Sequence, residues 1–401
     1  MQCADVTHAS TLAPPTVTQL GTAERTRSRH PLAVALGLFA LARLTGLAVL
    51  AATAWATGHH PLTLLGRSWD SRWYLDIAAH GYGHTLHLRP GVVYSDLAFF
   101  PLYPALVRAV TEASPLGGAA AGLLVSWTAA AAAACGIYAI GARLHGRAVG
   151  TALVLLWALL PHSVVLSMAY TEPVLTAFAA WSLYAVLSRR WLWAGTLAAL
   201  AGLSRPNGFA VAAAVLATAA YEIFQTVRRR EKVTHSLWTG AALAPLGWPA
   251  YVLWVGHRRG DLLGGYFAVQ RGWGSTFDFG RGSLRFARHV VLQGDRLVFP
   301  MTLLIVAAAA LLYALLLLDR PPLPLALYTA VLLLIALGGS GFFESKPRFL
   351  LPAFPLLLPL ARALVRTTRA RPWHAVAVTG ALAGLSFAYG AYLVVLADTP
   401  L

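Results

Sequence analysis

Long apolar runs dominate the pattern of hydrophobic and polar positions along the chain. Each run is close to the roughly 20 residues that a helix needs to cross the hydrocarbon core of a bilayer. Lipid offers the backbone no hydrogen-bond partners, so only helices and closed barrels span it, and continuous runs exclude the alternating pattern of a barrel. The pattern therefore predicts an all-α polytopic membrane protein. The clearest runs are residues 31–55, 117–142, 237–255, 297–318 and 373–397.

The first run carries one charged residue, Arg43, and follows a polar leader. A signal peptide has an apolar region of only about 7–15 residues, so we interpret this run as a retained first helix. Residues 1–30 are predicted to be a disordered cytoplasmic tail, and residues 31–397 a single transmembrane domain.

Arginine clusters between the runs indicate the orientation, because short basic loops stay in the cytoplasm. If about eleven spans alternate, the clusters fall on one side, which we place in the cytoplasm together with the N-terminus. Two long segments, residues 56–116 and 257–296, then form outer loops. These loops hold further arginines, and the binding of a phosphate-bearing ligand is one explanation for them. The clusters used are residues 25–29, 143–147, 189–190, 228–232 and 366–371.

Composition narrows the class of partner. Charged residues make up 11% of the chain and apolar residues 58%, whereas a soluble domain has about 25% charged residues. The net charge of +16 lies largely in loops between spans, so the lipid bilayer rather than nucleic acid is the expected partner. Two distant cysteines, Cys3 and Cys135, supply neither a disulfide framework nor a metal cluster.

The first outer loop has the features of an interfacial segment. Aromatic and apolar side chains recur at helical spacing over residues 73–78, which predicts a short amphipathic helix. Pro101 and Pro104 then break a second apolar stretch. Asp70 directly precedes the predicted helix. It is a candidate general base at the lipid–water boundary, but Asp70 or Ser71 could instead cap the helix.

Glu172 lies in a turn between two spans, before Pro173. Either it begins a helix, as Glu followed by Pro often does, or it is an acid at membrane depth with a functional role.

Arg205 and Asn207 interrupt an apolar region, residues 191–225, that must leave and return to the cytoplasmic side. A re-entrant or broken helix pair fits this segment, and such backbone is tolerated where it lines a cavity. The guanidinium fork suits phosphate oxygens, although Arg205 could also form a structural pair with a carboxylate. Lys346 and Arg348 have the same two interpretations, and either could instead extend toward the interface from a helix end.

Three nearby histidines, His80, His84 and His87, have spacings that could place metal ligands on one helical face. Gly81 and Gly83 interrupt that stretch, and we expect no cysteine or carboxylate to complete a metal site with these histidines. No metal site is predicted there.

An ordered set of motifs resembles the glycosylphosphatidylinositol mannosyltransferase II (PIG-V) family and its bacterial relatives. The set covers most of the chain between residues 40 and 360, and Pro206 stands where the family usually has serine. The matching segments are residues 69–74, 77–78, 81–82, 98–104, 170–172, 204–208, 270–274 and 347–352.

The resemblance implies a GT-C glycosyltransferase: a bundle of transmembrane helices with amphipathic helices in the first outer loop. Such an enzyme would take mannose from a polyprenyl-phosphate donor on the non-cytoplasmic face of the plasma membrane. It would pass the sugar to a lipid, glycan or protein acceptor. Asp70 matches the family's catalytic acid. The candidate substrate-binding residues are Arg72, Tyr82, Glu172, Arg205, Asn207, Gln270, Trp273, Lys346 and Arg348.

The implied reaction suits these residue types. An α-linked product from a β-linked donor requires a single displacement, for which one carboxylate base suffices. A phosphate leaving group is a weak base and needs positive charge rather than the second carboxylate of a glycosidase. No cofactor is expected, and the sequence has no nucleotide-binding motif of the P-loop type. Asp70 with Glu172 is the pair that could hold a divalent cation together with substrate phosphate.

Three other functions fit parts of the pattern. A lipid or solute transporter or flippase would carry charged residues within its spans, whereas here the acids concentrate at one face. A GT-C enzyme for another sugar, such as arabinose, is the nearest alternative. A non-catalytic subunit that scaffolds a partner transferase is the third.

Overall fold

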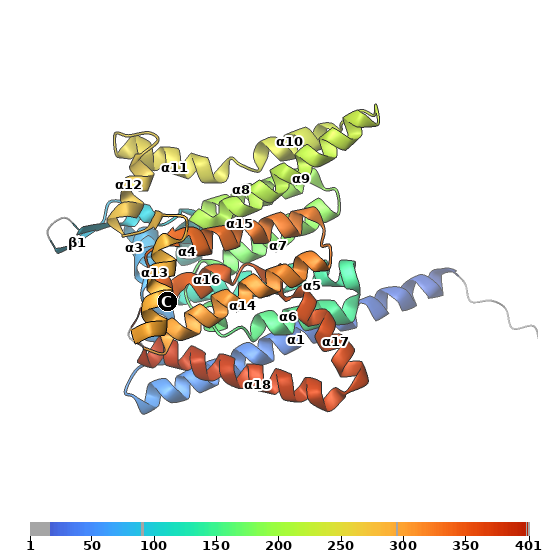
Figure 1. Cartoon of the computed structure of the whole chain (residues 1–401), viewed down its shortest axis with the longest axis horizontal. Helices are drawn as coiled ribbons and strands as arrows, with labels where there is room; N and C mark the ends of the chain where they lie inside the picture. The colour runs from blue at the N-terminus through green and yellow to red at the C-terminus, as the bar shows by residue number, and fades with distance from the viewer. Residues whose placement is uncertain (1–16, 90–91, 294–295, 398, 400–401) are drawn as a thin grey trace, which may run out of the picture.

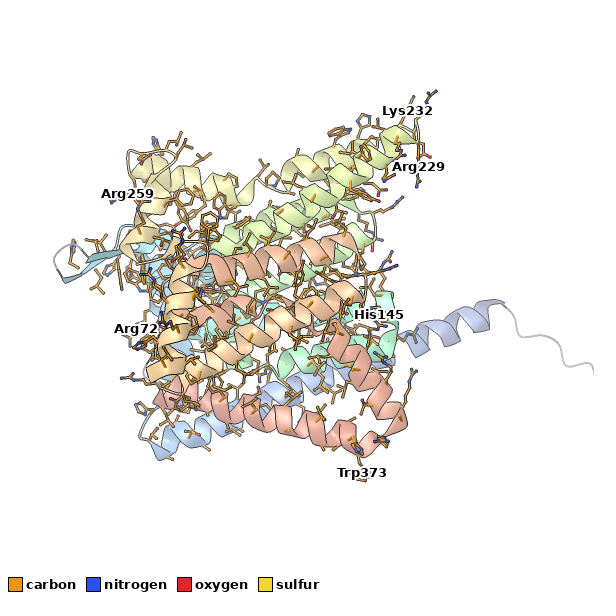
Figure 2. The ribbon with its side chains drawn as sticks, viewed as in Figure 1. Arg72, His145, Arg229, Lys232, Arg259 and Trp373 are labelled. Atoms are coloured by element: carbon orange, nitrogen blue, oxygen red, sulfur yellow. The ribbon has the colours of Figure 1, made fainter. Side chains whose placement is uncertain are left out.

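The computed structural model describes residues 17–89, 92–293, 296–397 and 399. Most long helices run side by side in one bundle, and shorter elements gather at one end of it (Figure 1). Arg72 and Arg259 lie at that end, whereas Arg229 and Lys232 lie at the other (Figure 2). The two predicted outer loops are therefore on one side of the bundle and the densest basic cluster is on the opposite side.

Four of the five long apolar runs fold into long helices, as predicted, whereas residues 237–255 form two short helices, His235–Leu243 and Gly247–Arg258. Five helices in the described part of the chain are long and apolar enough to cross a membrane, or six if one pair bent by 75° is a single span. Four shorter apolar helices lie among them, and the count of about eleven spans stays a prediction. The five are Pro31–Ala56, Gly118–His145, Pro206–Arg228, Val298–Leu318 and Pro372–Leu396; the bent pair is Phe343–Leu350 with Phe354–Ala370, and the shorter helices are Arg147–Ala158, Glu172–Leu187, Trp191–Ser204 and Leu323–Gly338.

The first helix begins earlier than expected. Residues 1–16 of the predicted tail lie outside the described residues, while residues 17–30 continue α1 (Val17–Ala56) away from the bundle (Figure 1). The remaining long elements are α5 (Gly118–His145), α6 (Arg147–Ala158), α7 (Glu172–Leu187), α8 (Trp191–Ser204), α9 (Phe209–Arg228), α10 (His235–Leu243), α11 (Gly247–Arg258), α14 (Val298–Leu318), α15 (Leu323–Gly338), α17 (Leu358–Ala370) and α18 (Pro372–Ala391), which ends in a π-helical turn, η6 (Tyr392–Leu396).

Small residues let these helices approach closely. A Cβ added to Gly136 of α5 would lie 2.9 Å from the Cβ of Ala180 on α7. A Cβ on Gly195 of α8 would overlap the carbonyl of Gly240 on α10. Such contacts are typical of membrane bundles, in which dispersion between closely packed helices replaces the hydrophobic effect.

The first outer segment builds the end of the bundle. The predicted helix over residues 73–78 is present as part of α3, and it buries Tyr74, Ile77 and Ala78. A new helix begins after Pro101, as its breaking role implies. Pro104 does not break the stretch as predicted, because it lies in the first turn of that helix, where the backbone N–H has no intrahelical partner to lose. The elements are α2 (Pro61–Arg67), α3 (Asp70–His80), a hairpin of β1 (Thr85–Arg89) and β2 (Val92–Ser95), a 3₁₀ turn η1 (Asp96–Ala98) and α4 (Leu102–Ala113).

Two later segments reach the same end. The apolar region around Arg205 is a helix pair, α8 and α9, joined by a 3₁₀ turn, η3 (Pro206–Gly208), as the interrupted pattern predicted. The second outer segment pairs β3 with β4 antiparallel, which ties it to the chain beyond α15. Its elements and their neighbours are α12 (Gly265–Gly272), β3 (Thr276–Phe277), α13 (Arg281–Gln293), β4 (Gly339–Ser340), η2 (Ser163–Ser167), η4 (Phe343–Ser345), α16 (Lys346–Leu350) and η5 (Phe354–Leu357).

Candidate active site

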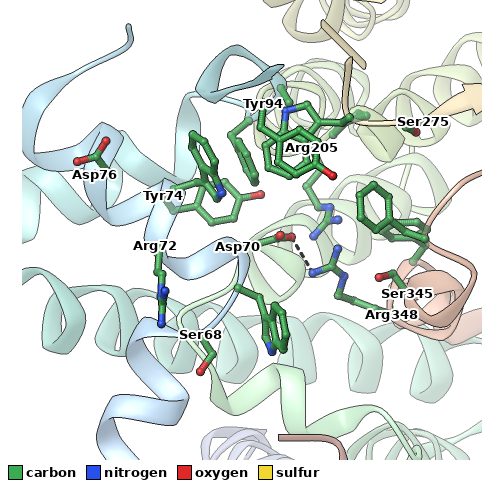
Figure 3. Close-up of a pocket in the computed structure, with 18 of the residues that line it drawn as sticks. Ser68, Asp70, Arg72, Tyr74, Asp76, Tyr94, Arg205, Ser275, Ser345 and Arg348 are labelled. Carbon is green, nitrogen blue, oxygen red and sulfur yellow. Dashed lines mark hydrogen bonds and ion pairs between the residues drawn. The ribbon is translucent and has the colours of Figure 1, made fainter. Parts of the chain in front are cut away.

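A cavity of about 1070 Å³ lies at the end of the bundle where these segments meet. Asp70, Arg205 and Arg348 all line it, although they come from α3, the α8–α9 break and α16. Figure 3 shows their side chains converging near the centre of the cavity. The fold therefore brings together three of the motifs singled out in the sequence.

Asp70 is the first residue of α3, and its carboxylate does not cap the helix. The N-cap is Trp69, which has φ 53° and makes no side-chain capping hydrogen bond. Instead, Asp70 Oδ2 accepts a hydrogen bond of 2.7 Å from Arg348 Nη1. The capping interpretation of Asp70 and Ser71 is thus wrong. The positive φ of Trp69, unusual for a bulky residue, lies at the start of the helix that presents Asp70 to the cavity.

Glu172 contacts both Arg205 and Arg348 and lies beneath the surface of the cavity. It is almost completely buried at the start of α7, where Pro173 follows as expected of a helix start. Its Oε1 pairs with Arg205 Nη1 and lies 3.2 Å from Arg348 Nε. Glu172 does not line the cavity, so its assignment as a substrate contact gains no support from the geometry. The structural interpretation of Arg205, a pair with a carboxylate, is correct.

Aromatic rings enclose both guanidinium groups. Arg348 lies 5.3 Å from the ring centroids of Tyr170 and Phe349, and Arg205 lies 5.5 Å from that of Phe349. Cations attract the faces of such rings, most strongly where water is excluded. Each arginine is only 6% exposed, so both are held rigidly and desolvated beside the cavity.

The break after α8 supplies a further polar group. Arg205 leaves the helix in an extended conformation, and Asn207 follows in the 3₁₀ turn. Asn207 also lines the cavity, and its Oδ1 is buried with no hydrogen-bond partner in the described part of the chain. Buried polar atoms rarely stay unpaired. This atom is therefore suited to receive a hydrogen bond from a bound molecule.

Three of the remaining candidates line the cavity. Arg72 donates through Nε to the carbonyl of Arg67 at 2.8 Å, and Figure 3 shows its side chain directed away from Asp70. Gln270 and Trp273 line the cavity from α12 and its end, and Trp273 Nε1 donates to the carbonyl of Ser95 at 3.0 Å. These contacts tie the second outer segment to the first.

Two candidates lie away from the cavity lining. Lys346 donates through Nζ to the carbonyls of Ala336 and Gly339, at 2.7 Å for the latter. Tyr82 donates to the carbonyl of Phe99 at 2.8 Å. Neither residue lines the cavity. Both hold backbone near the site, so their assignment as substrate contacts gains no support from the geometry.

Aromatic residues form one wall of the cavity; of these residues, only Trp273 was predicted to bind substrate. Trp73 stacks on Phe99 with 5.7 Å between ring centroids, and Trp273 stacks on Tyr94 at 4.1 Å. All four line the cavity, as does Tyr74. Burial raises the pKa of Tyr74 well above its usual range, so this phenol stays neutral. The density of aromatic residues in the first outer loop was the available sequence signal.

The two carboxylates that could hold a divalent cation share one guanidinium, and the expectation that no cofactor is needed stays a prediction. Asp70 and Glu172 both contact Arg348, so a guanidinium already supplies the positive charge between them. In the histidine stretch, where no metal site is predicted, a carboxylate does join the histidines: His80 Nδ1 lies 2.9 Å from Asp76 Oδ1 and His84 Nδ1 lies 4.0 Å from Asp76 Oδ2. Among the described residues, no group of three or more His, Cys, Asp or Glu side chains could hold a metal ion.

Comparison with protein-family models and with curated proteins finds no match. Solved structures of the oligosaccharyltransferase from Archaeoglobus fulgidus do match. Its apo form has a TM-score of 0.51 at 14% sequence identity, over 92% of this chain and 56% of that one. A complex of the same enzyme with an inhibitory peptide and a dolichol-phosphate has a TM-score of 0.48 at 14% identity, over 92% and 56%.

The match identifies the fold. The oligosaccharyltransferase is a GT-C glycosyltransferase, and this chain is a helical membrane protein whose fold is similar to that of this enzyme. It spans about half the length of the enzyme that it matches. The resemblance to the PIG-V family stays a prediction.

Proposed function

We propose that this chain is an inverting membrane glycosyltransferase that moves mannose from a polyprenyl-phosphate donor to a lipid, glycan or protein acceptor on the non-cytoplasmic face. The observation that carries the proposal is the carboxylate of Asp70 beside Arg348, in a cavity at one end of a GT-C bundle. The mannosyl donor and the side of the membrane rest on the motif resemblance and the distribution of basic loops.

Asp70 is the general base in this proposal. It takes the proton of the acceptor hydroxyl while the acceptor oxygen forms a bond to the anomeric carbon of the donor. The bond from that carbon to the phosphate oxygen breaks, and its electron pair leaves with the phosphate. Removing a base of this kind typically costs 10²–10⁴-fold in rate. Arg348 holds the Asp70 carboxylate in place in the cavity through the hydrogen bond of 2.7 Å from its Nη1 to Oδ2.

The arginines stabilise the leaving phosphate. Asp70 and Glu172 balance the charges of Arg205 and Arg348 before the reaction. When Asp70 becomes protonated it no longer neutralises Arg348, and this guanidinium charge becomes available as negative charge develops on the phosphate. Fixed charges that act at this moment lower the barrier without reorganisation. Glu172 is a positioning residue that holds both guanidinium groups.

Transfer of radiolabelled mannose from polyprenyl-phosphate mannose to endogenous acceptors tests this proposal. Membranes with the wild type, with Asp70→Asn and with an empty vector are compared. We expect label to appear with the wild type only, because asparagine keeps the shape of Asp70 and removes its basicity. Glu112→Gln is a matched control, since Glu112 is an exposed carboxylate on α4 that pairs with Arg108 at 2.8 Å. It should behave as the wild type.

Either of two results would contradict the proposal. If Asp70→Asn membranes transfer mannose at the wild-type rate, Asp70 is not the base. If all expressed variants match the empty vector, mannosyl transfer is wrong, and another donor sugar or a transport function takes its place.

A further inference from the structure

Helix α13 lies across the end of the bundle that holds the cavity. It runs at a steep angle to the long helices in Figure 1, and its N-terminus follows β3, close to the cavity-lining Ser275. Asp278 accepts hydrogen bonds from Gly280 N at 3.0 Å and Gly282 N at 2.7 Å, which fixes the start of the helix. A helix placed in this way is parallel to the plane of a membrane that the bundle spans.

One face of α13 is attached to the bundle. Ser283 Oγ donates to the carbonyls of Leu337 and Gly339 at 3.1 and 3.2 Å. Phe286 packs on Phe299 and Phe343, with 5.0 and 4.7 Å between ring centroids. The helix is therefore held in place through its inner face, so the outer face has a defined direction.

The outer face combines arginine with large apolar side chains. Arg281, Arg285 and Arg288 recur at i, i+4 and i+7, so they form one stripe, and all three are exposed. In the described part of the chain none of them lies within 4.0 Å of a carboxylate. Beside the stripe, Leu284, Val291 and Leu292 are exposed to 73, 70 and 68%.

We propose that this outer face of α13 binds the headgroups of anionic phospholipids at the membrane surface. The arginine stripe supplies charge that is complementary to lipid phosphates, and the adjacent leucine and valine side chains enter the boundary of the acyl chains. A helix with a basic stripe and an apolar row is typical of segments that lie in the interface. Without lipid at this face, three large apolar side chains would be exposed to water on a helix whose opposite face is attached to the bundle.

Fluorescence quenching on a reconstituted full-length chain tests this assignment. Leu292→Cys is labelled with a fluorophore in a background with Cys3→Ser and Cys135→Ala. The chain is placed in phosphatidylcholine nanodiscs that contain a small equal fraction of doxyl-labelled phosphatidylglycerol or doxyl-labelled phosphatidylcholine. We expect the anionic quencher to be several times more effective. Replacing Arg281, Arg285 and Arg288 by glutamine should abolish this preference, because one arginine alone contributes a factor of about five near anionic lipid.

A matched variant removes the same charge elsewhere. Arg228, Arg229 and Arg230 are exposed at the opposite end of the bundle, where Figure 2 labels Arg229. Replacing these three by glutamine should leave the preference at position 292 unchanged. Neither measurement involves turnover, so the result is independent of the proposed mannosyl transfer.

Three outcomes would overturn the proposal. Equal quenching by the two lipids would show that the arginines do not select anionic headgroups. Quenching by neither would show that the face lies in water or against protein. Loss of the preference on adding a trace of polyprenyl phosphate would assign the stripe to that phosphate rather than to bulk lipid.

Discussion

Asp70, Glu172, Arg205 and Arg348 form one continuous set of contacts in which each carboxylate faces a guanidinium. Arg348 contacts both acids, and Glu172 contacts both bases. A buried charge is tolerated when it is paired, and it becomes costly when one partner is removed. Because three of the four side chains are less than a tenth exposed, the integrity of the set depends on each member.

Replacing Glu172 by glutamine should destabilise the fold as well as reduce transfer. The change leaves two buried guanidinium groups with only Asp70 to balance them, and breaking a buried pair typically costs about 3–5 kcal/mol. Thermal unfolding in detergent measures the effect. Glu112→Gln, which disrupts an exposed pair, should change the free energy of unfolding by no more than about 1 kcal/mol.

A second variant separates charge balance from positioning. Glu172→Gln combined with Arg205→Met removes one cation and should recover much of the stability, while transfer stays low because the phosphate loses a guanidinium. If Glu172→Gln alone unfolds at the same temperature as Glu112→Gln, the buried set of contacts does not exist as described.

The close packing of α8 against α10 determines where Arg205 lies in the site. Arg205 follows the last residue of α8, so the position of that helix sets the position of the guanidinium. Gly195 on α8 and Gly240 on α10 approach so closely that a Cβ on either would overlap backbone of the other helix. The crossing therefore depends on the absence of side chains at two positions.

Substitution of Gly195 by alanine should push α8 away from α10. Overpacking of this kind costs about 1–3 kcal/mol, and the shift of α8 should also lower transfer activity. Gly380→Ala in α18 is the matched control, since a Cβ there meets nothing within 4 Å. Unfolding temperatures of the two variants are compared. A loss of stability in Gly380→Ala as large as in Gly195→Ala would contradict the role of the crossing.

The cavity belongs to the bundle as a whole, because no single segment contains it. Its walls come from the first outer segment, the α8–α9 break, α12 and the residues around α16. All of these lie at one end, and the basic residues Arg229 and Lys232 lie at the other (Figure 2). The arrangement gives the molecule two chemically distinct ends.

Labelling of single cysteines in intact cells tests which end faces outward. In the background without native cysteines, Thr85→Cys on the exposed β1 strand should react with a membrane-impermeant maleimide. Arg229→Cys should react only after the membrane is permeabilised, because short basic loops stay in the cytoplasm. The reverse pattern would place the cavity on the cytoplasmic side and remove the basis for an outward-facing active site.

The helical membrane class, the helix that follows Asp70 and the break at Arg205 were all predictable from the chain, because they depend on local apolar length and on local helix breakers. The helical spacing of Trp73, Tyr74 and the apolar residues that follow was also evident from the sequence. Their joining into one cavity wall was not, because stacking between Trp273 and Tyr94 depends on how two distant segments pack.

The pairings within the site were decided by tertiary packing. Asp70 and Arg348 are 278 positions apart, and no local pattern reports a contact at that separation. Lys346 and Arg348 lie in the same short motif, and the local sequence makes both of them candidates to bind phosphate. Helix α16 directs Arg348 to Asp70, while Lys346 contacts the carbonyls at the end of α15. Local sequence sets which charges are present near the membrane surface, but only the packing of the bundle sets which of them meet, because each must find its partner where water is excluded.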